Sequence, residues 1–211
     1  MKKLTLAALV LSFFAITVSA HDVFPPEWRG LDGTTMQVWE FDCDQSPAFP
    51  NLIDNDYGTA SACITVGEFG TGWLDNPGLG TQTGVWDIGG CDGQIVLDID
   101  NRPLALDHKE INLQIAYYQA IGGAPTVEIP GAELVSCQTQ LIEQDLMPGM
   151  GWYVFQSTWT ISPNPDHEQI IITGDVNGSV IDQIVVDTYC IPEPVTVALL
   201  GLGLICLRKR S

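Results

Sequence analysis

Apolar and polar residues alternate with a period of two along much of this chain, and helical periodicity is scarce. Such alternation is typical of β-strands that bury one face. It is clearest in segments 111–118 and 151–161. The residues that share one face are Ile111, Leu113, Ile115 and Tyr117 in the first segment, and Tyr153, Phe155, Trp159 and Ile161 in the second.

Shorter segments rich in β-branched and aromatic residues are also predicted strands, and Gly, Pro, Asn and Asp separate them. They are 36–41, 62–66, 84–88, 94–99, 126–129, 169–173 and 180–188. Segment 134–146 is the only place where a short helix would fit. Strands at this spacing, without a β-α-β rhythm, predict an all-β fold with a single antiparallel β-sandwich of the jelly-roll kind.

The first twenty residues have the pattern of a secretory signal peptide. Lys2 and Lys3 precede an apolar core over 4–18, and residues 18–20 are small, as signal peptidase requires. Cleavage after Ala20 would leave His21 as the new N-terminus. The pattern predicts export, with signal peptidase as a partner.

The other end of the chain reads IPEPVTVALLGLGLICLRKRS, with a Pro192-Glu193-Pro194 triplet before an apolar stretch over 195–207. Arg208, Lys209 and Arg210 follow, a charge pattern that keeps a tail on the cytoplasmic side of a membrane. As a helix the apolar stretch would reach only about 20 Å. Since a stable span needs about 20 residues, we expect a transient transmembrane helix.

This C-terminal segment resembles the PEP-CTERM sorting signal, which exosortases recognise in bacteria that make exopolysaccharide. The resemblance implies that Pro192, Glu193 and Pro194 form the recognition motif and that the protein ends at the cell surface or outside the cell. A plain membrane anchor with an incidental triplet is the alternative. The predicted divisions are a signal peptide over 1–20, a sandwich domain over 21–190 and a sorting signal over 191–211.

Stretches within the domain, HDVFPPEWRGLDGTTMQVWEFD, GVWDIGG and VIDQIVVDTYC, are similar to a recurring kind of exosortase-sorted surface β-sandwich of unassigned activity. The likeness implies the fold and carries no catalytic residue.

Charge in the domain is strongly unbalanced. Residues 21–191 hold 25 of the 26 acids but only three of the eight cations, a net charge of −22. Such a surface repels phosphate backbones, so no nucleic-acid partner is expected. It suits an extracellular protein, and divalent cations would relieve its self-repulsion.

Five cysteines lie in the domain, and none shows the CxxC spacing of zinc or thioredoxin-like sites. An exported protein favours disulfides, and we predict Cys137 with Cys190 and Cys43 with Cys63, among fifteen possible pairings.

No catalytic residue is predicted. GxSxG, HExxH and P-loop motifs are absent from the sequence. A terminal His21 could join a copper-binding histidine brace, but the only other histidines, His108 and His167, stand beside acids in apparent turns, where solvated histidines are the ordinary case.

A structural Ca²⁺ site is predicted around Asp182. Its phase in segment 180–188 puts it on the same face as Ile184 and Val186, and a buried carboxylate must be paired or ligated. First and last strands often lie together in sandwiches, so Glu40 and Asp42 could add the oxygens that calcium prefers. The alternative is a hydrogen-bonded or solvent-facing Asp182.

Two tryptophans in predicted loops, Trp73 and Trp152, are the candidates for stacking against a glycan, with packing as the alternative for each. Taken together, the patterns predict a non-catalytic surface or matrix component associated with exopolysaccharide. A calcium-stabilised carbohydrate-binding module is the second possibility, and a polysaccharide-active enzyme the third.

Overall fold

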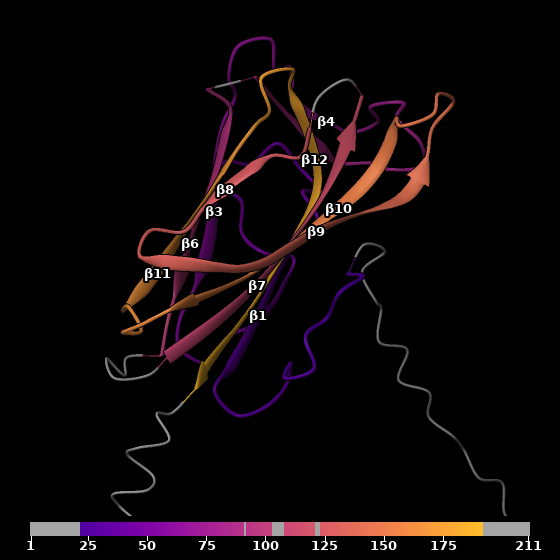
Figure 1. Ribbon diagram of the computed structural model, residues 1–211. Helices are drawn as coiled ribbons and strands as arrows, with labels where there is room; N and C mark the ends of the chain where they lie inside the picture. Colours follow the sequence, from indigo (N-terminus) through magenta and orange to yellow (C-terminus); the bar gives the residue numbers. More distant parts are fainter. Residues whose placement is uncertain (1–21, 91, 103–107, 121–122, 192–211) are drawn as a thin grey trace, which may run out of the picture.

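The fold is all-β, with two antiparallel sheets, in a computed structural model that describes residues 22–90, 92–102, 108–120 and 123–191 (Figure 1). No helix occurs within these ranges, so none of the described residues forms a helix that could cross a membrane. The predicted signal peptide, its cleavage residues Ala20 and His21, and the Pro192-Glu193-Pro194 motif with its apolar helix lie outside the described residues.

The two sheets differ in size, and we call them the large and the small sheet. The large sheet contains β1 (Thr34–Trp39), β2 (Leu52–Asp54), β4 (Gly72–Leu74), β5 (Val85–Gly89), β7 (His108–Gln119), β9 (Ala132–Gln144), β10 (Gly151–Ile161) and β12 (Ser179–Ile191). The small sheet contains β3 (Ala60–Thr65), β6 (Gln94–Asp100), β8 (Thr126–Glu128) and β11 (His167–Thr173).

The strand order is β2-β1-β12-β7-β10-β9 in the large sheet and β3-β6-β11-β8 in the small one. A short β4–β5 ribbon also pairs with β12, next to the place where β1 pairs with it. The first long strand and the last strand are therefore neighbours, as predicted, with Trp39 opposite Ile184.

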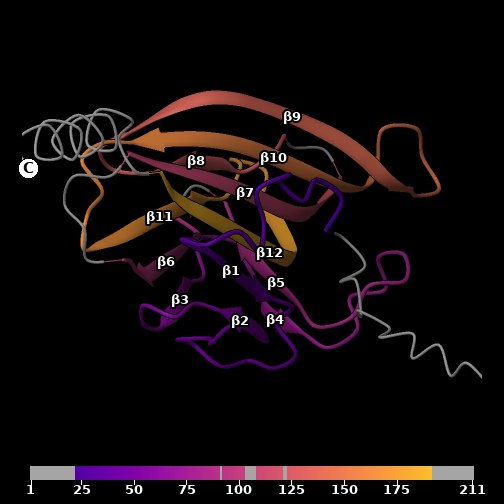
Figure 2. The same cartoon turned by 90° about the horizontal axis from the view of Figure 1, so that it is seen from below.

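All nine predicted strands are present, and the predicted helix is wrong. Segment 134–146 falls largely within β9, an exposed edge strand paired with β10 along its whole length. Figure 2 shows these two strands as a long curved hairpin at one edge of the molecule. Hydrogen bonding to β10 decides the conformation of β9, because few of its side chains are buried enough to leave a sequence pattern.

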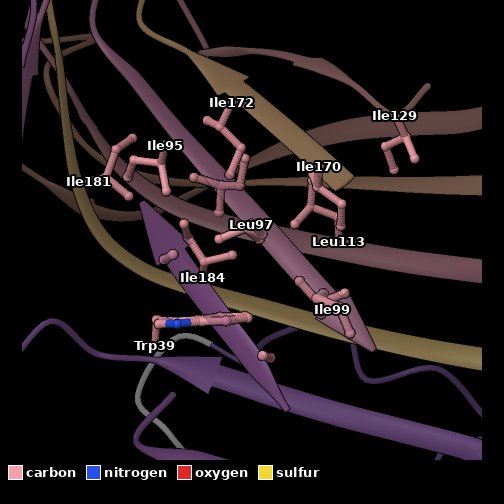
Figure 3. Packing of buried hydrophobic residues seen from close by; sticks show 14 of the residues in the cluster. Trp39, Ile95, Leu97, Ile99, Leu113, Ile129, Ile170, Ile172, Ile181 and Ile184 are labelled. Atoms are coloured by element: carbon pink, nitrogen blue, oxygen red, sulfur yellow. The ribbon is translucent and has the colours of Figure 1, made fainter. Parts of the chain in front are cut away.

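Apolar side chains from both sheets form one core. Trp39, Leu113 and Ile184 of the large sheet pack with a row of aliphatic residues of the small sheet, and Figure 3 shows the arrangement. Those small-sheet residues are Ile95, Leu97, Ile99, Ile170 and Ile172. The alternation in β7 and β10 is thereby explained, since the predicted inward rows of both strands pack in or against this core.

The outer face of the large sheet is also covered, by the segment that precedes β1. The backbone of Phe24 accepts a hydrogen bond from Asn112 and donates one to Gln114. The Arg29 guanidinium donates two hydrogen bonds, of 2.6 and 2.7 Å, to the carboxylate of Asp187, which is fully buried on β12. It also forms an ion pair with Asp22. Burial raises the pKa of Asp187, and the hydrogen bonds and charge of Arg29 oppose that rise.

A second ion pair joins the two sheets. Lys109 of β7 and Glu168 of β11 are both buried, and the Lys109 Nζ lies 2.6 Å from the nearer Glu168 oxygen. The remaining domain cation, Arg102, lies over the ring of Tyr57. All three domain cations therefore engage side chains of the same chain.

The predicted disulfides are not formed. Cys137 is an exposed free thiol on β9, and Cys190 is buried on β12, with β10 and β7 between the two strands. Three strand spacings of about 4.8 Å separate them, too far for the bond. Cys43 and Cys63 are also free thiols.

Replacing Arg29 by Gln should lower the free energy of unfolding by about 3 kcal/mol, because it leaves Asp187 buried without its counter-charge. Urea unfolding of residues 21–191 measures the change. Arg102→Gln is the matched control and should cost less than about 1 kcal/mol, the usual contribution of an exposed cation–π contact. Equal losses in both variants would contradict this role for Arg29.

Candidate functional site

A cleft of about 540 Å³ opens at the end of the sandwich where β7 ends and β12 begins. It is lined by residues of the β3–β4 loop and the β11–β12 turn, by Gly90 after β5, and by Ala120 and Gly123 after β7. The lining side chains that bear on its chemistry are Glu68, Phe69, Asp87, Tyr118, Gln119 and Asn177.

Close backbone packing holds the β3–β4 loop against the end of β5. Gly67 N–H donates to the Ile88 carbonyl at 2.8 Å, and Gly90 N–H donates to the Glu68 carbonyl at 2.9 Å. Gly89 has φ +72°, and a Cβ on it would lie 2.4 Å from the Gly70 nitrogen. Glycine is required there by both the conformation and the space.

Asp87 fixes the same loop from inside the cleft. Its carboxylate accepts hydrogen bonds from the Thr71 backbone (3.0 Å), the Thr71 hydroxyl (2.7 Å) and the Gly89 backbone (3.1 Å). Asp87 is thus occupied with holding the loop. Glu68 is the other carboxylate that lines the cleft.

The β11–β12 turn contributes another part of the lining. Asp175 accepts hydrogen bonds from the Asn177 backbone at 2.9 Å and from its side-chain amide at 3.0 Å. These bonds, the backbone one first, lower the pKa of Asp175. The turn leaves Val176 exposed at the rim and Asn177 lining the cleft.

The cleft combines an exposed aromatic ring with polar groups. Phe69 is 88% exposed. The same cleft is lined by the amides of Gln119 and Asn177 and by the carboxylate of Glu68, which can bind hydroxyl groups. The Tyr118 hydroxyl donates to Asp145, and burial raises the pKa of this phenol to about 12, so it stays protonated at neutral pH.

No histidine, lysine or cysteine is among the described residues that line the cleft. His108 and His167 begin β7 and β11, whereas the cleft lies where these strands end. The arrangement can bind an uncharged polar ligand through stacking and hydrogen bonds.

The structure brings the predicted calcium residues to one place. Glu40, Asp42 and Asp182 border a separate hollow of about 220 Å³, together with Gln183 and the loop 81–83. The hollow lies where β12 changes its edge partner, from β5 at Ile181 to β1 at Ile184.

The predicted phase of Asp182 is wrong. A register shift between Ile181 and Gln183 in the pairing with β7 makes Asp182 an extra residue, so Ile181, rather than Asp182, joins Ile184 in the core. Asp182 is nevertheless only 8% exposed.

Hydrogen bonds within the chain already engage the other two carboxylates of this hollow. Glu40 accepts from the Gln183 amide at 3.3 Å, and Asp42 accepts from the Asn51 amide. Across the described part of the chain, no three His, Cys, Asp or Glu side chains are grouped closely enough to hold a metal ion.

The two predicted stacking tryptophans both pack within the fold, Trp152 completely and Trp73 in part. Trp152 is 1% exposed, packs edge-on against Tyr118 and donates its indole N–H to the Leu79 carbonyl at 2.7 Å. Trp73 packs against the core and donates to the Phe41 carbonyl at 2.7 Å. Both side chains pack within the protein, as the alternative interpretation expected, and each indole N–H donates a hydrogen bond to a backbone carbonyl.

Phe69 was missed by the sequence reasoning. It stands in GEFGTG, where no alternation marks it, and its own signal is an aromatic residue between glycines in a predicted turn. A large apolar residue in such a place has little access to a core, which favours a surface role.

Comparison of this chain with protein-family models, with curated proteins and with solved structures finds no match to any of them.

Proposed function

We propose that this protein is an exported, non-catalytic β-sandwich of the cell surface or the extracellular matrix, associated with exopolysaccharide. The observation that carries the proposal is the distribution of charged side chains between the interior and the surface of the domain. Arg29, Arg102 and Lys109 engage partners within the chain, so exposed acids dominate the surface of a domain that holds 25 acids in all. A strongly anionic surface stays solvated and resists nonspecific association outside the cell.

The sandwich is proposed to be a jelly roll. From β6 to β8 the chain alternates between the small and the large sheet, and it alternates again from β10 to β12. The resulting neighbours, β1-β12-β7-β10 and β6-β11-β8, are those of two interlocked Greek keys. β9 departs from the pattern, because it pairs with β10 in the large sheet.

Export and sorting complete the proposal. Signal peptidase would remove residues 1–20, and an exosortase would recognise Pro192-Glu193-Pro194 while the C-terminal helix is transiently inserted in the inner membrane. β12 ends at Ile191, directly before the triplet, so processing there would spare every strand of the sandwich.

Replacing Pro192 and Pro194 by Ala should leave export intact and stop release or display beyond the inner membrane. Fractionation of the native host and immunoblotting measure the distribution. Thr196→Ala, in the same tail but outside the triplet, is the control and should distribute like the wild type. A wild-type distribution of the double variant would contradict sorting through the triplet.

Saccharide binding in the cleft is the second candidate function, and the exposure of Phe69 favours it. A ring that is 88% exposed, in a cleft that amide side chains also line, offers a stacking surface with hydrogen-bonding groups in the same cleft. The absence of cationic side chains from the described lining favours a neutral glycan over an acidic one.

Phe69→Ala should weaken glycan binding about tenfold, since loss of a stacking contact of about 1.4 kcal/mol changes affinity by that factor. Affinity electrophoresis in gels containing dextran, hydroxyethyl cellulose or the host's own exopolysaccharide measures it. Phe49→Ala removes another exposed phenylalanine, outside the cleft, and should change nothing. Wild-type protein that no gel retards would remove this second function.

The second candidate function, saccharide binding, includes a structural Ca²⁺ ion that would stabilise the domain. The hollow at the β12 bulge gathers Glu40, Asp42 and Asp182 with the side-chain oxygens of Gln82 and Thr83 nearby. Calcium binds six to eight oxygens and tolerates irregular geometry, so these side chains would have to close on the ion to bind it.

Millimolar Ca²⁺ should raise the melting temperature of residues 21–191, because a ligand that binds only the folded state stabilises it. Asp182→Asn should lose most of the gain, while Asp98→Asn, on the exposed side of β6, should keep it. An equal response to Mg²⁺ that survives in Asp182→Asn would indicate general charge screening instead of this site.

A further inference from the structure

Three buried polar side chains meet between the end of β6 in the small sheet and the start of β7 in the large sheet. Lys109 is 0% exposed, Glu168 3% and Asn101 4%. The Lys109 Nζ lies 2.8 and 2.6 Å from the two Glu168 oxygens, and it also contacts the Asn101 Oδ1. The Asn101 amide nitrogen in turn donates to Glu168.

The three groups therefore form a closed triangle of an amine, a carboxyl and a primary amide. Lysine would need only the carboxylate to balance its charge, yet its nitrogen also lies against the carbonyl end of the amide. The carboxyl bridges the amine and the nitrogen that would leave if the amide carbon were attacked. This arrangement has the nucleophile, the acyl group and the proton carrier of an acyl transfer.

The surroundings hold the triangle in place and exclude water. On the adjacent strands Lys109 is flanked by Ile161 and by the buried Cys190, and Glu168 is opposite Ile99. Asn101 is anchored on its other side, because its amide donates to the Pro165 carbonyl at 3.0 Å. Fixed contact between reacting groups replaces the encounter that limits the same reaction in solution.

Burial also favours the protonation states that the reaction needs. Loss of hydration lowers the pKa of Lys109 and raises the pKa of Glu168. Transfer of one proton from the ammonium to the carboxylate removes two buried charges together. It leaves a neutral amine, which is nucleophilic, beside a carboxylic acid, which can donate.

We propose that Lys109 and Asn101 react to form an intramolecular amide bond, with Glu168 transferring the protons. The Lys109 Nζ attacks the Asn101 Cγ, and a new C–N bond forms. The bond from Cγ to the Asn101 Nδ2 breaks, and this nitrogen leaves as ammonia with the proton that Glu168 takes from the lysine amine. One amide replaces another, so no oxidant, reductant or external group is needed.

The bond would tie the two sheets together covalently. Asn101 directly follows β6 of the small sheet, and Lys109 lies in β7 of the large sheet. A buried ion pair that connects the sheets would become a permanent link, insensitive to pH and salt, and useful in a protein exposed outside the cell.

Intact-mass spectrometry of the purified full chain, reduced and with its termini defined by peptide sequencing, tests the proposal. The mass should be lower than the sequence mass by one ammonia molecule. Proteolysis should release a branched peptide that joins Lys109 to Asn101, and fragmentation should locate the link. A folded wild-type chain with the full sequence mass would overturn the proposal.

Variants separate the cross-link from other losses of ammonia. Lys109→Met, Asn101→Ala and Glu168→Gln should each have the full mass of their own sequence. Asn177→Ala removes an exposed Asn-Gly pair that can lose ammonia by forming a succinimide, and it should retain the loss. Loss of ammonia that persists in Lys109→Met, or disappears in Asn177→Ala, would overturn the assignment. The wild-type measurement decides the matter even if a core variant fails to fold.

Discussion

A buried carboxylate needs a cation nearby to balance its charge, and this domain has only three lysine and arginine residues. Two of its three cations stand where carboxylates are most deeply buried, Arg29 against Asp187 and Lys109 against Glu168. The first pair fastens the segment before β1 across the outer face of the large sheet, and the second joins the large sheet to the small one. With the cations engaged there, the exterior is left to the acids, and this distribution shapes every function proposed for the molecule.

One irregularity in β12 positions Asp182 in the hollow that Glu40 and Asp42 also border. The strand pairs with β5 up to Ile181 and with β1 from Ile184, and the extra residue between them is Asp182. A regular strand would have placed that carboxylate in the core row. The bulge moves it to the gap between two edge partners, where Glu40 and Asp42 also lie. Bulges of this kind re-aim side chains at sites that bind ligands.

The cleft at the end of the sandwich does not depend on this bulge, because hydrogen bonds within and between its own loops hold it in shape. Asp87 holds the β3–β4 loop, which carries Phe69, by accepting a hydrogen bond from Thr71. Backbone hydrogen bonds from Gly67 and Gly90, which depend on close packing at glycines, hold the same loop. An aromatic ring can remain exposed there because the loop beneath it does not need that ring for its own packing. Trp152 shows the contrary case, since its indole N–H donates to the Leu79 carbonyl and its ring is buried. Trp73 is partly buried, and its indole N–H donates to the Phe41 carbonyl.

By itself the sequence determined the all-β class and nine of the strands, because alternation is a local property that one buried face imposes on each strand. It also predicted that the first and last strands would be neighbours. Only the tertiary structure decided that β9 is a strand, since its partner β10 supplies the reason, and that Asp182 leaves the core row, since the register with β7 shifts there. The same holds for the triangle of Asn101, Lys109 and Glu168: no local pattern marks it, and only the packing of two sheets brings an amide, an amine and a carboxyl from three separate segments into contact.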